Sequence, residues 1–143
     1  MKKPSTIVYQ ASATVTGGRE GSAKSDDGRL AVSLSTPTGL GGNDGPGTNP
    51  EQLFAAGYAA CFMGATRFVA GNAGIALPDD FSVTGKVGIG PTDGGFAIDV
   101  ELLISLPGID KDQAGQLIEQ SHQVCPYSNA TRGNIDVRLT LVD

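Results

Sequence analysis

The chain has 143 residues, of which 39% are hydrophobic and 17% are charged, and its formal net charge at pH 7 is -5. This length suits one domain with a real hydrophobic core, so we expect a single domain over residues 1–143. The acidic balance argues against nucleic acid or an anionic membrane as the main partner. The chain starts with two lysines but no apolar run, and no apolar stretch looks long and uninterrupted enough to span a bilayer. A cytoplasmic protein is therefore expected.

The first third of the chain is predicted to contain strands. Residues 6–15 form the first predicted strand, and a glycine-rich turn around Arg19 follows it. Residues 22–26 and 29–35 are predicted to pair as a hairpin, because the Asp-Gly dipeptide between them is a strong two-residue turn signal. The glycine-rich stretch 37–47 is predicted to be an irregular loop.

A long helix is predicted from Asn49 to about Gly71. Asn49 suits the N-cap, Pro50 suits the first helical position, and Gln52 completes a box-like capping pattern. A glycine such as Gly71 is a common helix stop. Apolar residues lie nearly all the way round, which is typical of a buried helix, and the many Ala and Gly residues would let another backbone approach closely.

The remaining pattern gives two strands, a helix and a strand. Residues 82–90 and 96–106 alternate apolar and polar side chains at period two. A second helix is predicted from near Asp110 to about Val124, because a proline two residues later limits its continuation. The last strand lies around residues 135–141. Hairpins dominate, so we expect an α+β fold with mainly antiparallel sheets around a buried central helix.

Two cysteines, Cys61 and Cys125, lie on the two predicted helices. They could serve redox catalysis, bind a metal, form a structural disulfide or be two ordinary buried thiols. Persistent structural disulfides are uncommon in the cytosol. A metal site has little support, because His122 is the only histidine and no Cys-x-x-Cys pair occurs. A Ser–His–Asp hydrolase is also poorly supported, since no Gly-x-Ser-x-Gly motif occurs.

Each thiol taken alone is most simply an ordinary buried cysteine, because free cysteine behaves as a small hydrophobic residue. Cys61 is not at a helix N-terminus, so a reactive Cys61 needs a neighbouring cation to stabilise its thiolate. Glu51, the carboxylate on this helix, lies ten residues earlier, or about 15 Å away along a straight helix. Glu51 is therefore either a first-turn carboxylate that suits the helix dipole, which is the simpler interpretation, or it acts on Cys61 of another subunit.

Two segments, 49–62 (Asn-Pro-Glu-Gln-Leu-Phe-Ala-Ala-Gly-Tyr-Ala-Ala-Cys-Phe) and 124–137 (Val-Cys-Pro-Tyr-Ser-Asn-Ala-Thr-Arg-Gly-Asn-Ile-Asp-Val), closely resemble the signature segments of the organic hydroperoxide resistance (Ohr) proteins. These belong to the Ohr/OsmC family of bacterial thiol peroxidases. The resemblance extends to length, element order and the early Gly-Gly-Arg-Glu-Gly turn. It implies an OsmC-like fold in an intertwined homodimer, with active sites at the subunit boundary and the central helices back to back.

The resemblance also implies residue roles. Cys61 matches the peroxidatic cysteine and Cys125 the resolving one, while Arg19 and Glu51 match the catalytic arginine and its carboxylate partner. The implied reaction reduces alkyl or fatty-acid hydroperoxides to alcohols through a Cys61 sulfenic acid and a Cys61–Cys125 disulfide. The expected reductant is a dithiol of the lipoyl type carried on a protein, with no cofactor and no metal.

Two alternative functions stay open at this point. The first is an OsmC-type thiol peroxidase with a different substrate preference. The second is a redox-sensing or binding module whose cysteines form a switch without sustained turnover. Comparing an alkyl hydroperoxide with hydrogen peroxide separates the first from the Ohr assignment, and catalytic consumption of peroxide separates the second.

Overall fold

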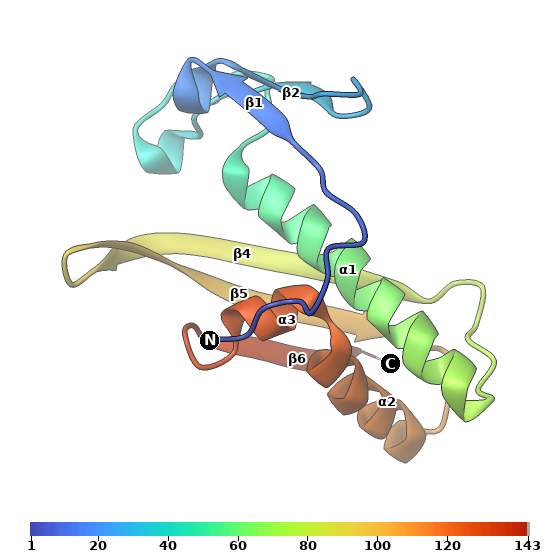
Figure 1. The fold of residues 1–143 in the computed structure, drawn as a ribbon. Coiled ribbons are helices and arrows are strands. Elements are labelled where there is room, and N and C mark those ends of the chain that lie inside the picture. The colour runs from blue at the N-terminus through green and yellow to red at the C-terminus, as the bar shows by residue number, and fades with distance from the viewer. Residues whose placement is uncertain (143) are drawn as a thin grey trace. The chain divides into compact units, whose positions relative to one another are not determined.

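The computed structural model describes residues 1–142 (Figure 1). The chain falls into two compact units, Met1–Leu53 and Phe54–Asp143. Each unit contains a three-stranded sheet of its own. The observed α+β class agrees with the sequence analysis, and the single domain over residues 1–143 stays a prediction.

The first unit is built on a sheet of order β1-β2-β3, in which both pairs are antiparallel. Its elements are β1 (Ala13–Thr16), the 3₁₀ turn η1 (Gly18–Glu20), β2 (Ser22–Ser25), β3 (Ala31–Ser33) and the 3₁₀ turn η2 (Thr38–Leu40). The predicted hairpin is confirmed. The predicted strand over residues 6–15 is wrong in extent, because β2 is only four residues long and pairs with residues 13–16 alone.

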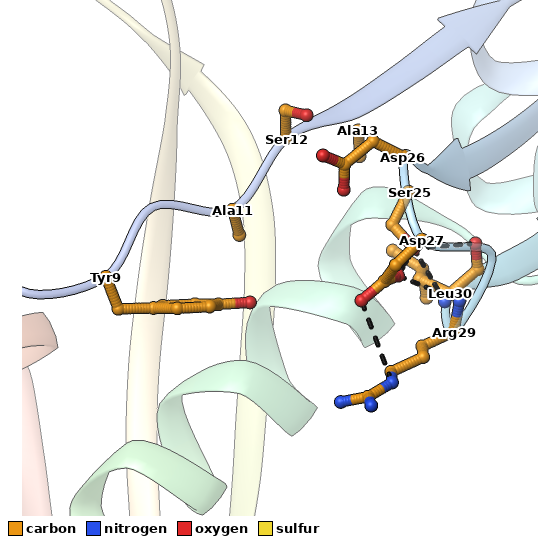
Figure 2. A pocket seen from close by; sticks show the side chains of 9 residues that line it. All are labelled: Tyr9, Ala11, Ser12, Ala13, Ser25, Asp26, Asp27, Arg29 and Leu30. Carbon is orange, nitrogen blue, oxygen red and sulfur yellow. Dashed lines mark hydrogen bonds and ion pairs between the residues drawn. The ribbon is translucent and has the colours of Figure 1, made fainter.

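The β2–β3 turn is held by its own side chains. The Asp27 carboxylate accepts hydrogen bonds from the Ser25 hydroxyl (2.7 Å) and from the Arg29 backbone N–H (2.9 Å). Gly28 has φ 75°, which explains the glycine at this turn. Figure 2 shows the Tyr9 ring on the N-terminal segment, at a shallow hollow of about 450 Å³ beside this turn.

The second unit is built on a sheet of order β4-β5-β6. Strands β4 (Ser82–Thr92) and β5 (Gly95–Ser105) form a long antiparallel hairpin, and β6 (Val137–Val142) pairs with β5 in parallel. Alternate β5 residues point into the core, where Val100, Leu102 and Ile104 are fully buried. The helices of this unit cover that face and complete the core with Phe62, Leu117 and Ile118 among others.

The structure contains the two predicted helices, one of them with a different end, and one helix that the sequence pattern does not predict. They are α1 (Pro50–Ala73), α2 (Lys111–Val124) and α3 (Pro126–Thr131). The Asn49 carboxamide accepts the Gln52 N–H (2.9 Å), which confirms the predicted N-cap. Helix α1 runs past Gly71 and ends before Gly74, whose φ of 69° suits a helix stop. The sequence pattern does not predict helix α3, because Pro126 marks the end of α2, whereas proline is also favoured at a first helical position.

Helix α1 is the central helix, but the single chain buries only one of its sides, where the sequence predicted burial all round. Tyr58, Phe62, Thr66 and other residues of this side lie in the core. The opposite side is exposed and includes the small residues Ala56, Ala60, Gly64 and Gly71 together with the larger Arg67 and Phe68. By length and composition alone α1 could also cross a bilayer, whereas the sequence analysis expected no apolar stretch long enough to do so. A core helix of a soluble protein passes the same test, and the buried side of α1 is a core surface.

Candidate functional site

The two cysteines lie together. The Cys125 thiol donates a hydrogen bond to Cys61 Sγ at an S–S distance of 3.5 Å. Both are free thiols, with Cys61 partly buried and Cys125 fully buried. A disulfide needs an S–S distance of about 2.05 Å, so the sulfurs lie roughly 1.5 Å from bonding distance. A small local shift would therefore join them.

Each sulfur is positioned by a different helix. Cys61 lies in the middle of α1, next to the fully buried Phe62. Cys125 forms the corner between α2 and α3, where its extended backbone (φ -60°, ψ 123°) separates the two helices. The Cys125 N–H donates to the Ser121 carbonyl (2.8 Å) and its carbonyl accepts from the Asn129 N–H (2.9 Å). The corner thus belongs to both hydrogen-bonded helices and points Sγ at α1.

The surroundings of Cys61 favour the neutral thiol. The pKa of Cys61 is raised from 9.0 to about 11: burial is the largest cause, a hydrogen bond from the Tyr127 backbone opposes the rise, and the nearby Cys125 thiol adds to it. A thiol with this pKa is ionised in about one molecule in ten thousand at pH 7. Since the thiolate is the nucleophile, rapid chemistry at Cys61 requires an additional cation close to the sulfur.

Arg19 and Glu51 form a second pair, within the unit Met1–Leu53. Arg19 Nη1 donates to Glu51 Oε2 (2.9 Å) and Nη2 donates to Oε1 (2.7 Å), which is a bidentate ion pair. The Glu51 side chain is 14% exposed and that of Arg19 is 36% exposed. The hydrogen bond from Arg19 lowers the pKa of the Glu51 carboxyl, and the same bond raises the pKa of Arg19. One chain is therefore sufficient to form this pair.

The predicted site residues are thus brought together as two pairs, each within its own unit. His122 joins neither pair and instead bonds the Ser128 hydroxyl through Nδ1 (2.8 Å). Burial and the nearby Arg132 lower the pKa of His122. Within residues 1–142, the His, Cys, Asp and Glu side chains form no cluster of three or more that could hold a metal.

Sequence reasoning missed two parts of the thiol surroundings. The Tyr127 backbone bonds Cys61, and its ring packs against Phe54 and Tyr58 at centroid distances of 6.0 and 5.6 Å. The Tyr127 hydroxyl lies 2.9 Å from where a Cβ on Gly57 would be, so a larger residue at position 57 would force the tyrosine side chain to shift. The other missed part is a buried hydroxyl network around Tyr58. A tyrosine on an otherwise apolar helix was a signal for it, because a buried hydroxyl needs a partner.

The α+β fold and the contact between two free thiols place this chain in the class of thiol proteins. The profile of the OsmC-like protein family matches residues 41–140. The chain is 59% identical over 141 residues to the organic hydroperoxide resistance protein of Xanthomonas axonopodis pv. citri (strain 306), with 99% of each chain covered. It is 44% identical over 137 residues to the organic hydroperoxide resistance protein OhrB of Bacillus subtilis (strain 168), covering 94% of this chain and 98% of that protein.

Solved structures agree. A crystal structure described as that of an organic hydroperoxide resistance protein from Vibrio cholerae O1 biovar eltor, with captopril bound in one of its active sites, superimposes with a TM-score of 0.91 at 49% identity. The match covers 97% of this chain and 95% of that one. The crystal structure of Bacillus subtilis OhrB gives a TM-score of 0.86 at 44% identity, with 95% and 100% covered. The chain belongs to the OsmC-like family and, within it, to the organic hydroperoxide resistance proteins.

Proposed function

We propose that this protein is a cysteine-based peroxidase that reduces organic hydroperoxides to alcohols. The observation that carries the proposal is the contact between the two free thiols, Cys61 and Cys125, at 3.5 Å. Membership of the organic hydroperoxide resistance family supports the substrate class. The aromatic rings of Phe54, Tyr58 and Tyr127 in the same unit are consistent with an organic rather than a small polar substrate.

The proposed chemistry has three steps. The Cys61 thiolate attacks one oxygen of R-O-OH, the O–O bond breaks, and the alcohol R-OH leaves after taking up a proton. Cys61 is left as a sulfenic acid. The Cys125 thiol then attacks the Cys61 sulfur, water leaves, and a disulfide forms, which protects Cys61 from further oxidation. Two electrons from a dithiol restore both thiols by exchange.

In the proposal, Arg19 supplies the cation that Cys61 needs. A guanidinium is permanently charged and planar, so it can stabilise a thiolate and donate a hydrogen bond to a peroxide oxygen. Glu51 holds two of the Arg19 nitrogens, which fixes the orientation of the guanidinium. The role is assigned to Arg19 on the family resemblance, and the raised pKa of Cys61 supports the need for a cation near this thiol.

We further propose that the functional form is a cytoplasmic homodimer. The exposed side of α1 carries small residues such as Ala60 and Gly64, and a second helix could approach such a surface closely. The N-terminal segment also leaves Ile7, Val8 and Tyr9 at 65%, 92% and 78% exposure. A second copy of the chain would cover both surfaces. The proposed reductant is a lipoyl-type dithiol on a partner protein, acting as co-substrate.

A peroxidase assay tests the function. Purified protein should consume tert-butyl hydroperoxide catalytically with dihydrolipoamide as reductant, faster than with thioredoxin. Hydrogen peroxide should be the slower substrate. A clear preference for hydrogen peroxide would count against this substrate class, and a single stoichiometric oxidation without turnover would favour a redox sensor.

A further inference from the structure

A hydrogen-bonded network of three hydroxyl groups and one imidazole links the three helices that carry or flank the thiol pair. The Tyr58 hydroxyl is hydrogen-bonded to Ser128 Oγ (2.9 Å) and to Thr131 Oγ1 (3.1 Å). Ser128 Oγ is in turn bonded to His122 Nδ1 (2.8 Å). Tyr58 and Ser128 are fully buried, and Thr131 is nearly so. The network therefore connects α1, α2 and α3 in the core.

The residues of this network lie close to the two cysteines in the sequence. Tyr58 lies three residues before Cys61 on α1, and Ser128 lies three residues after Cys125 on α3. The hydroxyl bond between Tyr58 and Ser128 therefore ties the helical turn that carries one thiol to the helical turn that follows the other. His122 extends the tie to α2, three residues before Cys125.

Helix α3 depends on such a tie. It has six residues, and a helix this short is not stable on its own in water. Its tertiary contacts consequently decide where the Cys125 corner lies. A hydrogen bond is directional, so the Tyr58 hydroxyl fixes α3 against sliding or rotation in a way that apolar packing alone does not.

We propose that Tyr58 and Ser128 are positioning residues that hold Cys125 Sγ next to Cys61 Sγ for disulfide closure. This positioning of the two thiols does not depend on the proposed function. Its role in resolving a sulfenic acid on Cys61 rests on the proposed function. When the tie is cut, Cys125 spends less time beside Cys61. A Cys61 sulfenic acid then survives long enough to meet a second hydroperoxide, which oxidises it to the sulfinic acid and leaves as its alcohol.

The chain offers a matched control for a purely structural effect. Ser121 is also a fully buried serine, but its hydroxyl donates only to the Leu117 carbonyl of its own helix (2.6 Å). Ser128→Ala and Ser121→Ala each remove one buried hydroxyl. Only Ser128→Ala removes a bond between the cysteine-bearing elements. Tyr58→Phe cuts the same tie while keeping the buried ring, and it provides a second variant if Ser128→Ala folds poorly.

The first experiment uses no peroxide. Each protein is equilibrated in glutathione buffers of graded redox poise, quenched with acid, and analysed by intact mass for the Cys61–Cys125 disulfide. In this reaction the protein loses two electrons and two protons to oxidised glutathione. Tyr58→Phe and Ser128→Ala should each lower the equilibrium constant for the internal disulfide roughly tenfold, as expected for the loss of the Tyr58–Ser128 hydrogen bond, which both variants lack. Ser121→Ala should leave it unchanged. An equal loss in Ser121→Ala, or no loss in both tie variants, would overturn the proposal.

The second experiment exposes the same proteins to tert-butyl hydroperoxide without reductant and measures the ratio of disulfide to sulfinic acid. Tyr58→Phe and Ser128→Ala should shift this ratio towards the sulfinic acid, while Ser121→Ala should match the unmodified protein. An unchanged ratio in the tie variants would contradict a role in resolution. If the unmodified protein does not react with hydroperoxide at all, the proposed function fails, and the glutathione experiment still decides the positioning role.

Discussion

Cys125 Sγ lies 3.5 Å from Cys61 Sγ, although the two residues are 64 positions apart in the chain. The fold closes a long loop to make this contact, so a covalent bond here would remove much conformational freedom from the unfolded chain. In the chain-entropy account, a loop of this length makes the disulfide worth about 4 kcal/mol. The contact is therefore a potential redox switch of stability as well as of chemistry.

We expect the oxidised protein to unfold at a distinctly higher denaturant concentration than the reduced protein. The physical reason is the loop closure across α1 and the α2–α3 corner, and the measurement is urea unfolding followed by circular dichroism, with and without a dithiol. Cys125→Ser provides the control, because it cannot form the bond and should show no such difference. Equal midpoints for the two redox forms of the unmodified protein would mean that the bond does not close between these residues.

The Arg19 role predicts a measurable change in the pKa of Cys61. In a Cys125→Ser background, titration of the thiolate by its ultraviolet absorbance should give a pKa well below the value of about 11 that the surroundings of Cys61 otherwise produce. Arg19→Ala should raise this pKa towards that value, because the stabilising cation is lost. Arg29→Ala, which removes an exposed arginine at the β2–β3 turn, is the matched control and should have no effect. A pKa that is the same with and without Arg19 would remove the arginine from the site.

The Arg19–Glu51 pair predicts a pH dependence of stability. Its hydrogen bond lowers the pKa of the Glu51 carboxyl below the ordinary value of 4.5. The stabilisation is thus fully present above pH 4.5 and is lost as pH falls through the lowered pKa, because the protonated carboxyl no longer attracts Arg19. Glu51→Gln should cost about 1 kcal/mol of unfolding free energy at pH 7, and this difference should shrink on acidification. A difference that grows at low pH would contradict the pairing.

The exposed side of α1 predicts a dimer that a single bulky or charged substitution breaks. Ala60→Glu should shift the protein towards the monomer in light scattering at micromolar concentration, because the charge would be buried against the second copy. Gln116→Glu adds the same charge to an exposed position of α2 and should leave the mass unchanged. A monomeric unmodified protein would refute the dimer outright.

The sequence predicted the elements that local chemistry determines. Asn49 marks the start of α1 because its side chain caps the helix it precedes, and the period-two pattern located both long strands. The end of α1 was misplaced because Gly71 and Gly74 both suit a helix stop, and only the backbone conformation separates them. The first strand was overextended because a strand-forming pattern over residues 6–15 carries no information on how long its partner strand is.

For the candidate site, too, the sequence predicted some features and not others. Cys61 and Cys125 could be paired only through the family resemblance, since their contact depends on tertiary packing rather than spacing. The sequence also left two roles open for Glu51, and the structure shows a bidentate contact with Arg19 within one chain. The sequence signalled that the Tyr58 hydroxyl needs a partner but did not identify Ser128, because the two residues are 70 positions apart in the chain.

The role of the Cys61 sulfur as the reacting atom is tested by comparing Cys61→Ser and Cys125→Ser in a peroxide assay, with sulfur oxidation measured by mass spectrometry. Cys61→Ser should consume no tert-butyl hydroperoxide above background. Cys125→Ser should reduce about one equivalent to form the sulfenic acid on Cys61 and then oxidise further to the sulfinic acid, without sustained turnover. Sustained activity in Cys61→Ser would contradict the account, because it would place the reacting atom somewhere other than the Cys61 sulfur.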